Sequence, residues 1–157
     1  MKQKTLAKWL KAIIVGLGIC GVLVYFVILP MIMKDTLYDD LESYFLPWII
    51  FLWTTSIPCY AVLFFALKVA GNIGLDKSFC MENAVCLKRI SYMAIVDSVY
   101  FFVGNIVLCL FNISHPGVFI ASLFVIFLGV VIAVAAAVLS HLIVKAAELQ
   151  EESDLTI

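Results

Sequence analysis

The chain has 157 residues, of which 65% are hydrophobic and 13% are charged, and its formal net charge is -1. A water-soluble domain is about half apolar and about a quarter charged, so this composition leaves too few polar side chains to cover a surface facing water. Because the apolar residues also fall into long runs, they exclude a soluble globular protein and indicate an integral membrane protein of one domain.

Four apolar runs are each long enough for a transmembrane helix, which needs about 20 residues. They cover residues 12–33, 47–67, 90–111 and 118–144. The first run is too long for a signal peptide and is not followed by a small-residue cleavage site. Since unpaired backbone groups are not tolerated in lipid, each run is expected to be helical. The sequence therefore predicts an all-α protein, a four-transmembrane-helix bundle.

The basic residues predict how this bundle is oriented. Four lysines precede the first run, four basic residues lie in the segment 68–89, and one lysine follows the fourth run. Only Lys34 lies on the other side of the predicted spans. Cytoplasmic segments of membrane proteins carry the excess of Lys and Arg. Both termini, the loop 68–89 and the tail 145–157 are therefore predicted to lie in the cytoplasm.

The first outer loop is acidic and also carries an apolar stripe. Its stripe falls at helical spacing and predicts a short helix lying on the outer surface, with residues Leu37, Leu41, Phe45 and Trp48. Its acids form a candidate outer-loop site, with residues Asp35, Asp39, Asp40 and Glu42. They are either a docking surface for a cationic peptide or a metal ion, or simply a solvated polar face.

The third and fourth helices are predicted to extend beyond the membrane into the cytoplasm. No helix breaker separates Phe79 from the third apolar run, so that helix is expected from about residue 79 to residue 111. The fourth run continues in the same way past Lys145 into an acidic segment. Two parallel helical extensions would offer a binding surface to a cytoplasmic partner, with Phe79 and Asn83 among the candidate contact residues.

Asp97 is the only acidic residue inside a predicted span. A charge near the middle of a bilayer costs about 3 kcal/mol on insertion scales, so such a residue commonly has a partner or a function. His141 and Lys68 lie near the cytoplasmic ends of their spans, and a cluster of Asp97 with either of them is a hypothesis. It would be a proton- or ligand-sensitive switch, or alternatively a structural hydrogen bond or a neutral carboxyl group.

A row of small residues on the fourth helix, Gly129, Ala133 and Ala137, would permit close helix approach within the bundle or between copies in a homo-oligomer. The sequence carries no motif for catalysis or for a cofactor. The five cysteines do not show the spacing of a metal site, and no phosphate-binding loop or nucleophile motif is present. We therefore expect a non-enzymatic protein with no cofactor, no metal and no direct contact with nucleic acid.

Two segments carry a family resemblance. They are Gly74-Leu-Asp-Lys-Ser-Phe-Cys-Met-Glu-Asn-Ala-Val-Cys-Leu-Lys-Arg-Ile90 and the end of the chain from Leu142, which closes with Glu-Leu-Gln-Glu-Glu-Ser-Asp-Leu-Thr-Ile157. Both resemble a bacterial membrane family, domain of unknown function 2975, whose closing motif is the more specific of the two. Ser153 stands where the family pattern has Asn, and Phe79 follows Gly74 at a wider spacing than in the family. The resemblance implies four helices and the bacterial cytoplasmic membrane, but no activity.

Such proteins often accompany small helix-turn-helix regulators, so the resemblance implies a membrane component that holds or releases a DNA-binding partner. The tail fits this role, because it offers acidic side chains to a basic partner and apolar side chains as anchors. These candidate residues are Glu148, Glu151, Glu152, Asp154, Leu155 and Ile157. Two alternatives remain: a small transporter or channel component that uses Asp97, and an immunity or receptor protein for a cationic peptide.

Overall fold

The computed structural model describes residues 3–31, 42–112, 114 and 116–155. This part of the chain is built from α1 (Gln3–Leu23), a π-helical turn η1 (Val24–Ile28), α3 (Glu42–Gly74), α4 (Met81–Leu110) and α5 (Pro116–Leu155). It contains four helices that are long and apolar enough to cross a membrane. The all-α, four-helix architecture predicted from the sequence is therefore confirmed.

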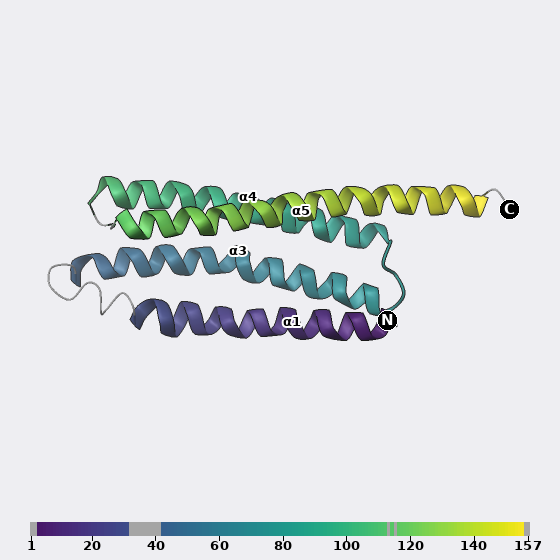
Figure 1. Ribbon diagram of the computed structural model, residues 1–157, viewed down its shortest axis with the longest axis horizontal. Helices are drawn as coiled ribbons and strands as arrows, with labels where there is room; N and C mark the ends of the chain where they lie inside the picture. The colour runs from purple at the N-terminus through teal and green to yellow at the C-terminus, as the bar shows by residue number, and fades with distance from the viewer. Residues whose placement is uncertain (1–2, 32–41, 113, 115, 156–157) are drawn as a thin grey trace.

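Successive helices run in opposite directions along one common axis (Figure 1). The start of α1, the connection from α3 to α4 and the end of α5 all lie at the same end of the molecule (Figure 1). We call it the basic end, because the described lysines and the arginine lie in or next to it, at positions 4, 8, 11, 68, 77, 88, 89 and 145. The two termini of the described chain thus share one end.

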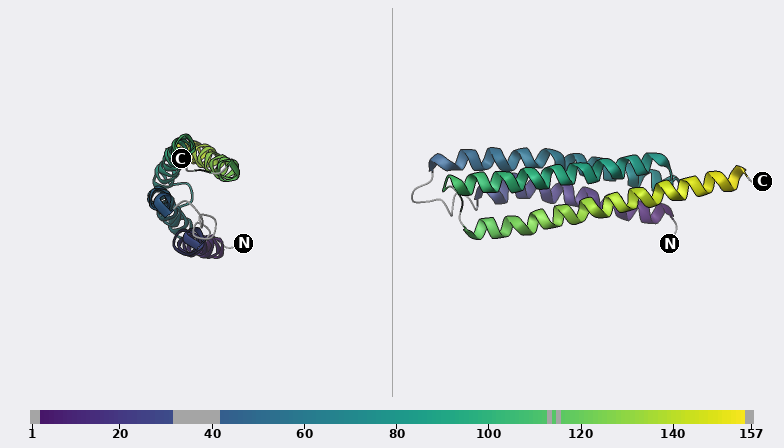
Figure 2. Two further views of the ribbon diagram at one scale, coloured as in Figure 1. Left: turned by 90° about the vertical axis from the view of Figure 1, so that its left-hand side faces the viewer. Right: turned by 90° about the horizontal axis from the view of Figure 1, so that it is seen from above.

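The four helices form an open row in which each packs against its neighbours in the chain. Within the described residues, α1 packs on α3, α3 on α4, and α4 on α5, while α1 has no packing contact with α5. Viewed along the axis, the row curves into an arc (Figure 2). The arrangement is an open bundle, a feature that apolar run lengths do not predict.

The contact between α4 and α5 is the most extensive and is lined by small side chains. A methyl group at Gly129 of α5 would collide with the hydroxyl of Ser98 on α4, so the two backbones approach closely there. The Ser140 hydroxyl donates a hydrogen bond to the Ala84 carbonyl oxygen across the same interface, at 2.7 Å. Small residues at such an interface allow the close packing that associates helices in lipid.

The row of small residues on α5 differs from the predicted one in its last member. Ala133 and Ala136 are buried, whereas Ala137 is exposed. Buried positions on α5 recur every seven residues, at Ser122, Ala136 and Ile143 with Gly129 between them. A seven-residue repeat follows the gentle left-handed crossing of two helices, whereas a strict four-residue step drifts off the contact face.

The helix α3 begins earlier than the apolar run and passes without interruption through Pro47 and Pro58. Trp48, which we expected on a separate helix at the outer surface, is a part of α3 and is only 7% exposed. It packs with Phe51 and Leu108 between α3 and α4. The surface-helix prediction is therefore wrong for Trp48, because the neighbouring helix covers its ring, and residues 32–41 lie outside the described residues.

The connection from α3 to α4 is short, since α3 ends at Gly74 and α4 begins at Met81. The buried side chain of Asn83 organises it by donating hydrogen bonds to the carbonyl oxygens of Lys77 and Ser78, both at 3.0 Å. Its own carbonyl oxygen accepts a hydrogen bond from Asn72 at 2.8 Å. The helices α3 and α4 both continue well beyond their apolar runs toward the basic end. This extension was predicted for α4, the third of the four expected helices.

Candidate functional site

Four polar side chains from three helices meet inside the apolar part of the bundle. The Cys59 thiol of α3 donates a hydrogen bond to Oδ2 of Asp97 on α4, at 3.5 Å. The Tyr25 hydroxyl of η1 donates to the sulfur of Cys59 at 3.9 Å and lies 3.3 Å from the hydroxyl oxygen of Thr55. We call this set of Tyr25, Thr55, Cys59 and Asp97 the Asp97 cluster.

Local backbone structure helps to assemble the Asp97 cluster. Tyr25 lies in the π-helical turn Val24–Ile28, and such turns are frequent at functional sites because they redirect a side chain. Thr55 and Cys59 are four residues apart on α3 and therefore share one face of the helix. The cluster ties together α3 and both of the helical segments that flank it.

The carboxyl group of Asp97 is only partly satisfied. Its Oδ1 atom is buried and has no hydrogen-bond partner among the described residues. A buried polar atom without a partner is costly and commonly marks a site that serves a purpose other than stability. Chemically, a carboxyl, a thiol and two hydroxyl groups in a chain can exchange protons or contact a small cation.

Lys68 does not join this cluster, contrary to one form of our hypothesis. It follows Cys59 by nine residues on α3, which is about 13 Å along the helix axis. Its ammonium group instead pairs with Glu82 at 2.8 Å. Glu82, at the start of α4, lies closer to Lys68 than Asp97 does and therefore forms the ion pair.

His141 does not join it either. The neighbouring Ser140 is hydrogen-bonded to Ala84, which lies 13 residues from Asp97 on α4, or about 20 Å along the axis. The His141 side chain is exposed on the surface of α5. The register between α4 and α5 therefore separates the two residues, and the sequence offered no way to determine that register.

The partners that Asp97 does have were not predicted from the sequence. Tyr25 and Thr55 interrupt apolar runs with hydroxyl groups, which was the available signal, whereas Cys59 was interpreted as a small hydrophobic residue. Asn105 was missed as well: it is fully buried, and its Oδ1 lacks a partner among the described residues. Within the same residues, no three His, Cys, Asp or Glu side chains lie close enough to hold a metal ion.

At the basic end, an ion pair joins Lys68 of α3 to Glu82 of α4, and both residues lie outside the apolar runs 47–67 and 90–111. The hydrogen bond from Lys68 lowers the pKa of the Glu82 carboxyl group, and that carboxylate raises the pKa of Lys68 in return. Asn72 also donates a hydrogen bond to Glu82, at 3.3 Å. This exposed network links α3 to α4 on the side from which α5 projects.

The end of α5 extends beyond α4 and carries several of the predicted partner-binding residues (Figure 1). Glu148, Glu151 and Glu152 are exposed there, and so is the apolar side chain of Leu149, at 66%. Leu149 is not among the residues predicted from the sequence. The side chains of Asp154 and Leu155, and the whole of Ile157, lie outside the described part.

The remaining candidate residues divide between exposed, buried and undescribed positions. Phe79 is exposed, whereas Asn83 is fully buried and holds the α3–α4 connection, so its side chain is not accessible to a partner. Of the outer-loop acids, Asp35, Asp39 and Asp40 lie outside the described residues. Glu42 begins α3, and its side chain is likewise outside the described part.

Comparison with known proteins extends the resemblance seen in the sequence. The family described as "Protein of unknown function (DUF2975)" matches residues 30–157. The chain is also similar to "Uncharacterized membrane protein YoaS" from Bacillus subtilis (strain 168), with 36% identity over 110 residues, or 69% of each chain. No solved structure matches the chain. With four membrane-spanning helices and a family match over most of its length, this membrane protein belongs to the DUF2975 family.

Proposed function

We propose that the chain is a non-enzymatic regulatory protein of the bacterial cytoplasmic membrane, which binds a basic soluble protein with the projecting end of α5. The observation that carries this proposal is the length of α5. It has 40 residues against 30 in α4, so its last turns extend about 15 Å beyond the helix pair. A helix that leaves the bundle is free to present its side chains to a partner.

The chemistry of this projection favours a basic partner. Glu148 lies one helical turn before Glu151 and Glu152, so the three carboxylates fall on one side of α5. Acidic surfaces attract basic proteins and accelerate their association. Leu149 adds an exposed apolar contact next to these acids. A small helix-turn-helix regulator, which is basic because it binds DNA, has the matching chemistry.

The orientation belongs to the same proposal. The basic end carries the described lysines and the arginine, and such residues are concentrated on the cytoplasmic side of membrane proteins. With this orientation, both termini and the projecting end of α5 face the cytoplasm, where a DNA-binding partner resides. The test introduces a cysteine at Ser153 in a chain whose five native cysteines are replaced by alanine, and adds a cysteine-reactive, membrane-impermeant label. Labelling only after cell lysis is expected.

The binding test is a crosslinked affinity purification from native membranes. The full chain is compared with a chain truncated after Gln150, and with a full-length variant that carries Glu148→Lys and Glu151→Lys. We expect one small basic DNA-binding protein to be recovered with the full chain alone. Equal amounts of all three chains in the membrane fraction show that insertion is unchanged. Recovery of the same protein with the truncated chain contradicts the proposal.

A second candidate function, transport of protons or a small cation, is favoured by the unpartnered Oδ1 of Asp97. The test is flux into proteoliposomes that contain the wild-type chain or Asp97→Asn. Asp76→Asn is the matched control, because Asp76 lies in the α3–α4 connection with a φ of 61°, which Asn adopts readily. Loss of flux with Asp97→Asn alone supports transport, and equal flux from all three chains contradicts it.

A further inference from the structure

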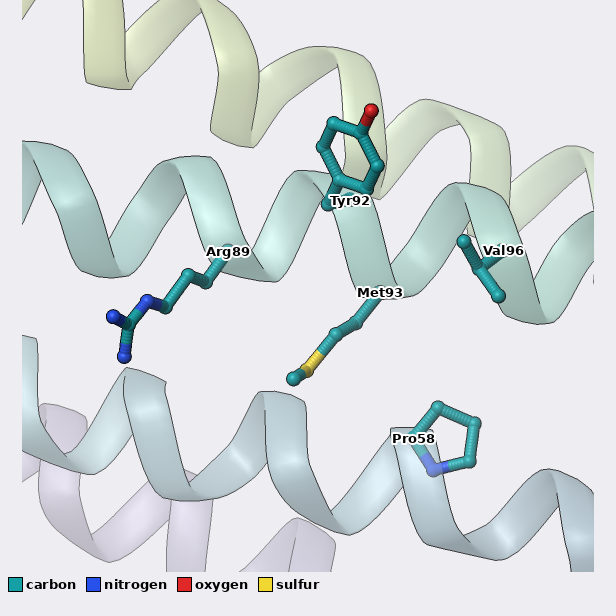
Figure 3. A pocket seen from close by; sticks show the side chains of 5 residues that line it. All are labelled: Pro58, Arg89, Tyr92, Met93 and Val96. Atoms are coloured by element: carbon teal, nitrogen blue, oxygen red, sulfur yellow. The ribbon is translucent and has the colours of Figure 1, made fainter.

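An open groove lies between α3 and α4, on the surface of the apolar part of the bundle (Figure 3). It has a volume of about 370 Å³, and its lining consists of Pro58, Arg89, Tyr92, Met93 and Val96. Arg89 and Met93 extend from α4 toward α3, and Pro58 lies on α3 across from Val96 (Figure 3). Apart from the guanidinium and phenol groups, the lining side chains are apolar, so the groove suits a hydrocarbon chain.

The groove has its charged residue at the depth of the lipid headgroups and its apolar residues at the depth of the acyl chains. Arg89 directly precedes the apolar run 90–111, which places it at the level of the lipid headgroups. Val96 lies seven residues further along α4, about 10 Å deeper. Tyr92 is 72% exposed on the rim, and tyrosine is enriched at this boundary between headgroups and hydrocarbon. Along the membrane normal, the groove therefore begins with the cation Arg89 and continues with the apolar side chains of Met93 and Val96.

Arg89 is available for a phosphate. Its guanidinium carbon lies 5.5 Å from the centre of the Phe65 ring, and no carboxylate pairs with it within the described part of the chain. The nearby carboxylate of Glu82 is already bound by Lys68 and Asn72. Stacking on an aromatic ring leaves the edge of the guanidinium group open, and that edge can bind a phosphate through two hydrogen bonds.

We infer that the groove between α3 and α4 binds one anionic phospholipid, with its phosphate on Arg89 and one acyl chain along Met93 and Val96. Charge selects the lipid: a net negative headgroup is attracted by the Arg89 guanidinium group, while a zwitterionic headgroup carries a compensating positive charge. The groove is open to the lipid phase, so a lipid enters it from the surrounding leaflet. This site is independent of the partner proposed for α5.

The test is native mass spectrometry of the full chain in detergent, titrated with phosphatidylglycerol or with phosphatidylcholine of the same acyl chains. We expect one tightly held phosphatidylglycerol and a preference of about tenfold over phosphatidylcholine. Arg89→Gln should lower this preference to about twofold or less, because the phosphate loses its charged partner. Lys88→Gln is the matched control: Lys88 is an exposed cation one residue away that does not line the groove, and its removal should leave the preference within about twofold of wild type.

A second variant tests the contribution of the apolar part of the groove separately from that of the Arg89 charge. Val96→Trp places an indole ring in the apolar channel, at a side chain that is already exposed, and is expected to remove the tightly held lipid while the thermal midpoint stays unchanged. The inference is overturned if Arg89→Gln retains the wild-type preference, if Lys88→Gln weakens it as much as Arg89→Gln does, or if Val96→Trp holds the lipid as firmly as wild type.

Discussion

The helices at the two edges of the row, α1 and α5, are attached to their neighbours in different ways. On α5, small residues meet small residues of α4, and a methyl group at Gly129 has no room. On α1, only Ala7 and Ile14 are buried, and a methyl group at Gly16 would meet nothing within 4 Å. One edge helix is tightly interlocked with its neighbour, whereas the other packs on its neighbour less extensively.

Hydropathy does not explain this difference. The spans that contain α1 and α5 have nearly equal mean hydropathy, 2.8 and 3.0. In lipid, apolar side chains gain little by exchanging lipid for another helix, so association depends on close packing and hydrogen bonds. The family match begins at residue 30, after η1, and therefore covers α3, α4 and α5 but not α1. The tightly packed part of the molecule is the part that the family match covers.

The largest expected effect comes from filling the α4–α5 interface. Gly129→Leu places a large side chain against the Ser98 hydroxyl and the Ala94 carbonyl, so the helices must separate. We expect the free energy of unfolding in detergent to fall by about 3 kcal/mol. Stability is measured by heating the protein in detergent and using size-exclusion chromatography to determine how much folded, monodisperse protein remains.

Gly16→Leu on α1 is the matched control for this change. It introduces the same side chain at a glycine that faces open space, so a change of at most about 0.5 kcal/mol is expected. If both variants lose stability equally, then α1 is packed as tightly as α5 and the contrast between the two edges is wrong.

A smaller effect is expected from removing one hydrogen bond in the same interface. Ser140→Ala deletes the buried hydroxyl that donates to the Ala84 carbonyl oxygen at 2.7 Å. Interhelical hydrogen bonds in membranes contribute about 1 kcal/mol, and a loss of that size is expected in the same assay. Ser56→Ala is the control, since that exposed hydroxyl binds the Trp53 carbonyl oxygen of its own helix and joins no second helix among the described residues. An equal loss from both variants would show that the interhelical bond adds nothing.

The sequence predicted the parts of this fold that depend on run length and composition. The four helices follow from the apolar runs. The start of α4 at Met81, before its apolar run begins at residue 90, follows from the absence of a helix breaker in that segment. The register between helices could not be predicted, because it depends on which small residues meet. For that reason the sequence paired Asp97 with His141 or Lys68, whereas the register places Cys59 beside it. Trp48 was assigned to the surface because a helical stripe does not reveal whether lipid or a helix covers it.

A still smaller effect is expected at the other edge. Tyr60→Phe removes the hydroxyl that donates to the Gly18 carbonyl oxygen at 3.0 Å and so joins α3 to α1. Because this hydrogen bond is only partly buried, whereas that of Ser140 is buried, about 0.5 kcal/mol should be lost, which is less than for Ser140→Ala. The more informative measurement is limited proteolysis of the chain in detergent, in which α1 should be released faster from the variant. A loss of stability larger than that of Ser140→Ala would reverse the order of the two edges.

The smallest expected effect concerns the exposed ion pair in the middle of the row, between Lys68 of α3 and Glu82 of α4. The hydrogen bond from Lys68 lowers the pKa of Glu82 in the folded chain. A carboxyl group whose folded pKa is lowered stabilises the fold above its unfolded pKa, about 4.3, and loses that contribution as the pH falls through the folded value. The difference in thermal midpoint between wild type and Glu82→Gln should therefore be largest at neutral pH and shrink as the pH falls below about 4. It should also shrink in high salt, because exposed charges are screened. A difference that is constant across this pH range would mean that the glutamate acts through packing rather than through its charge.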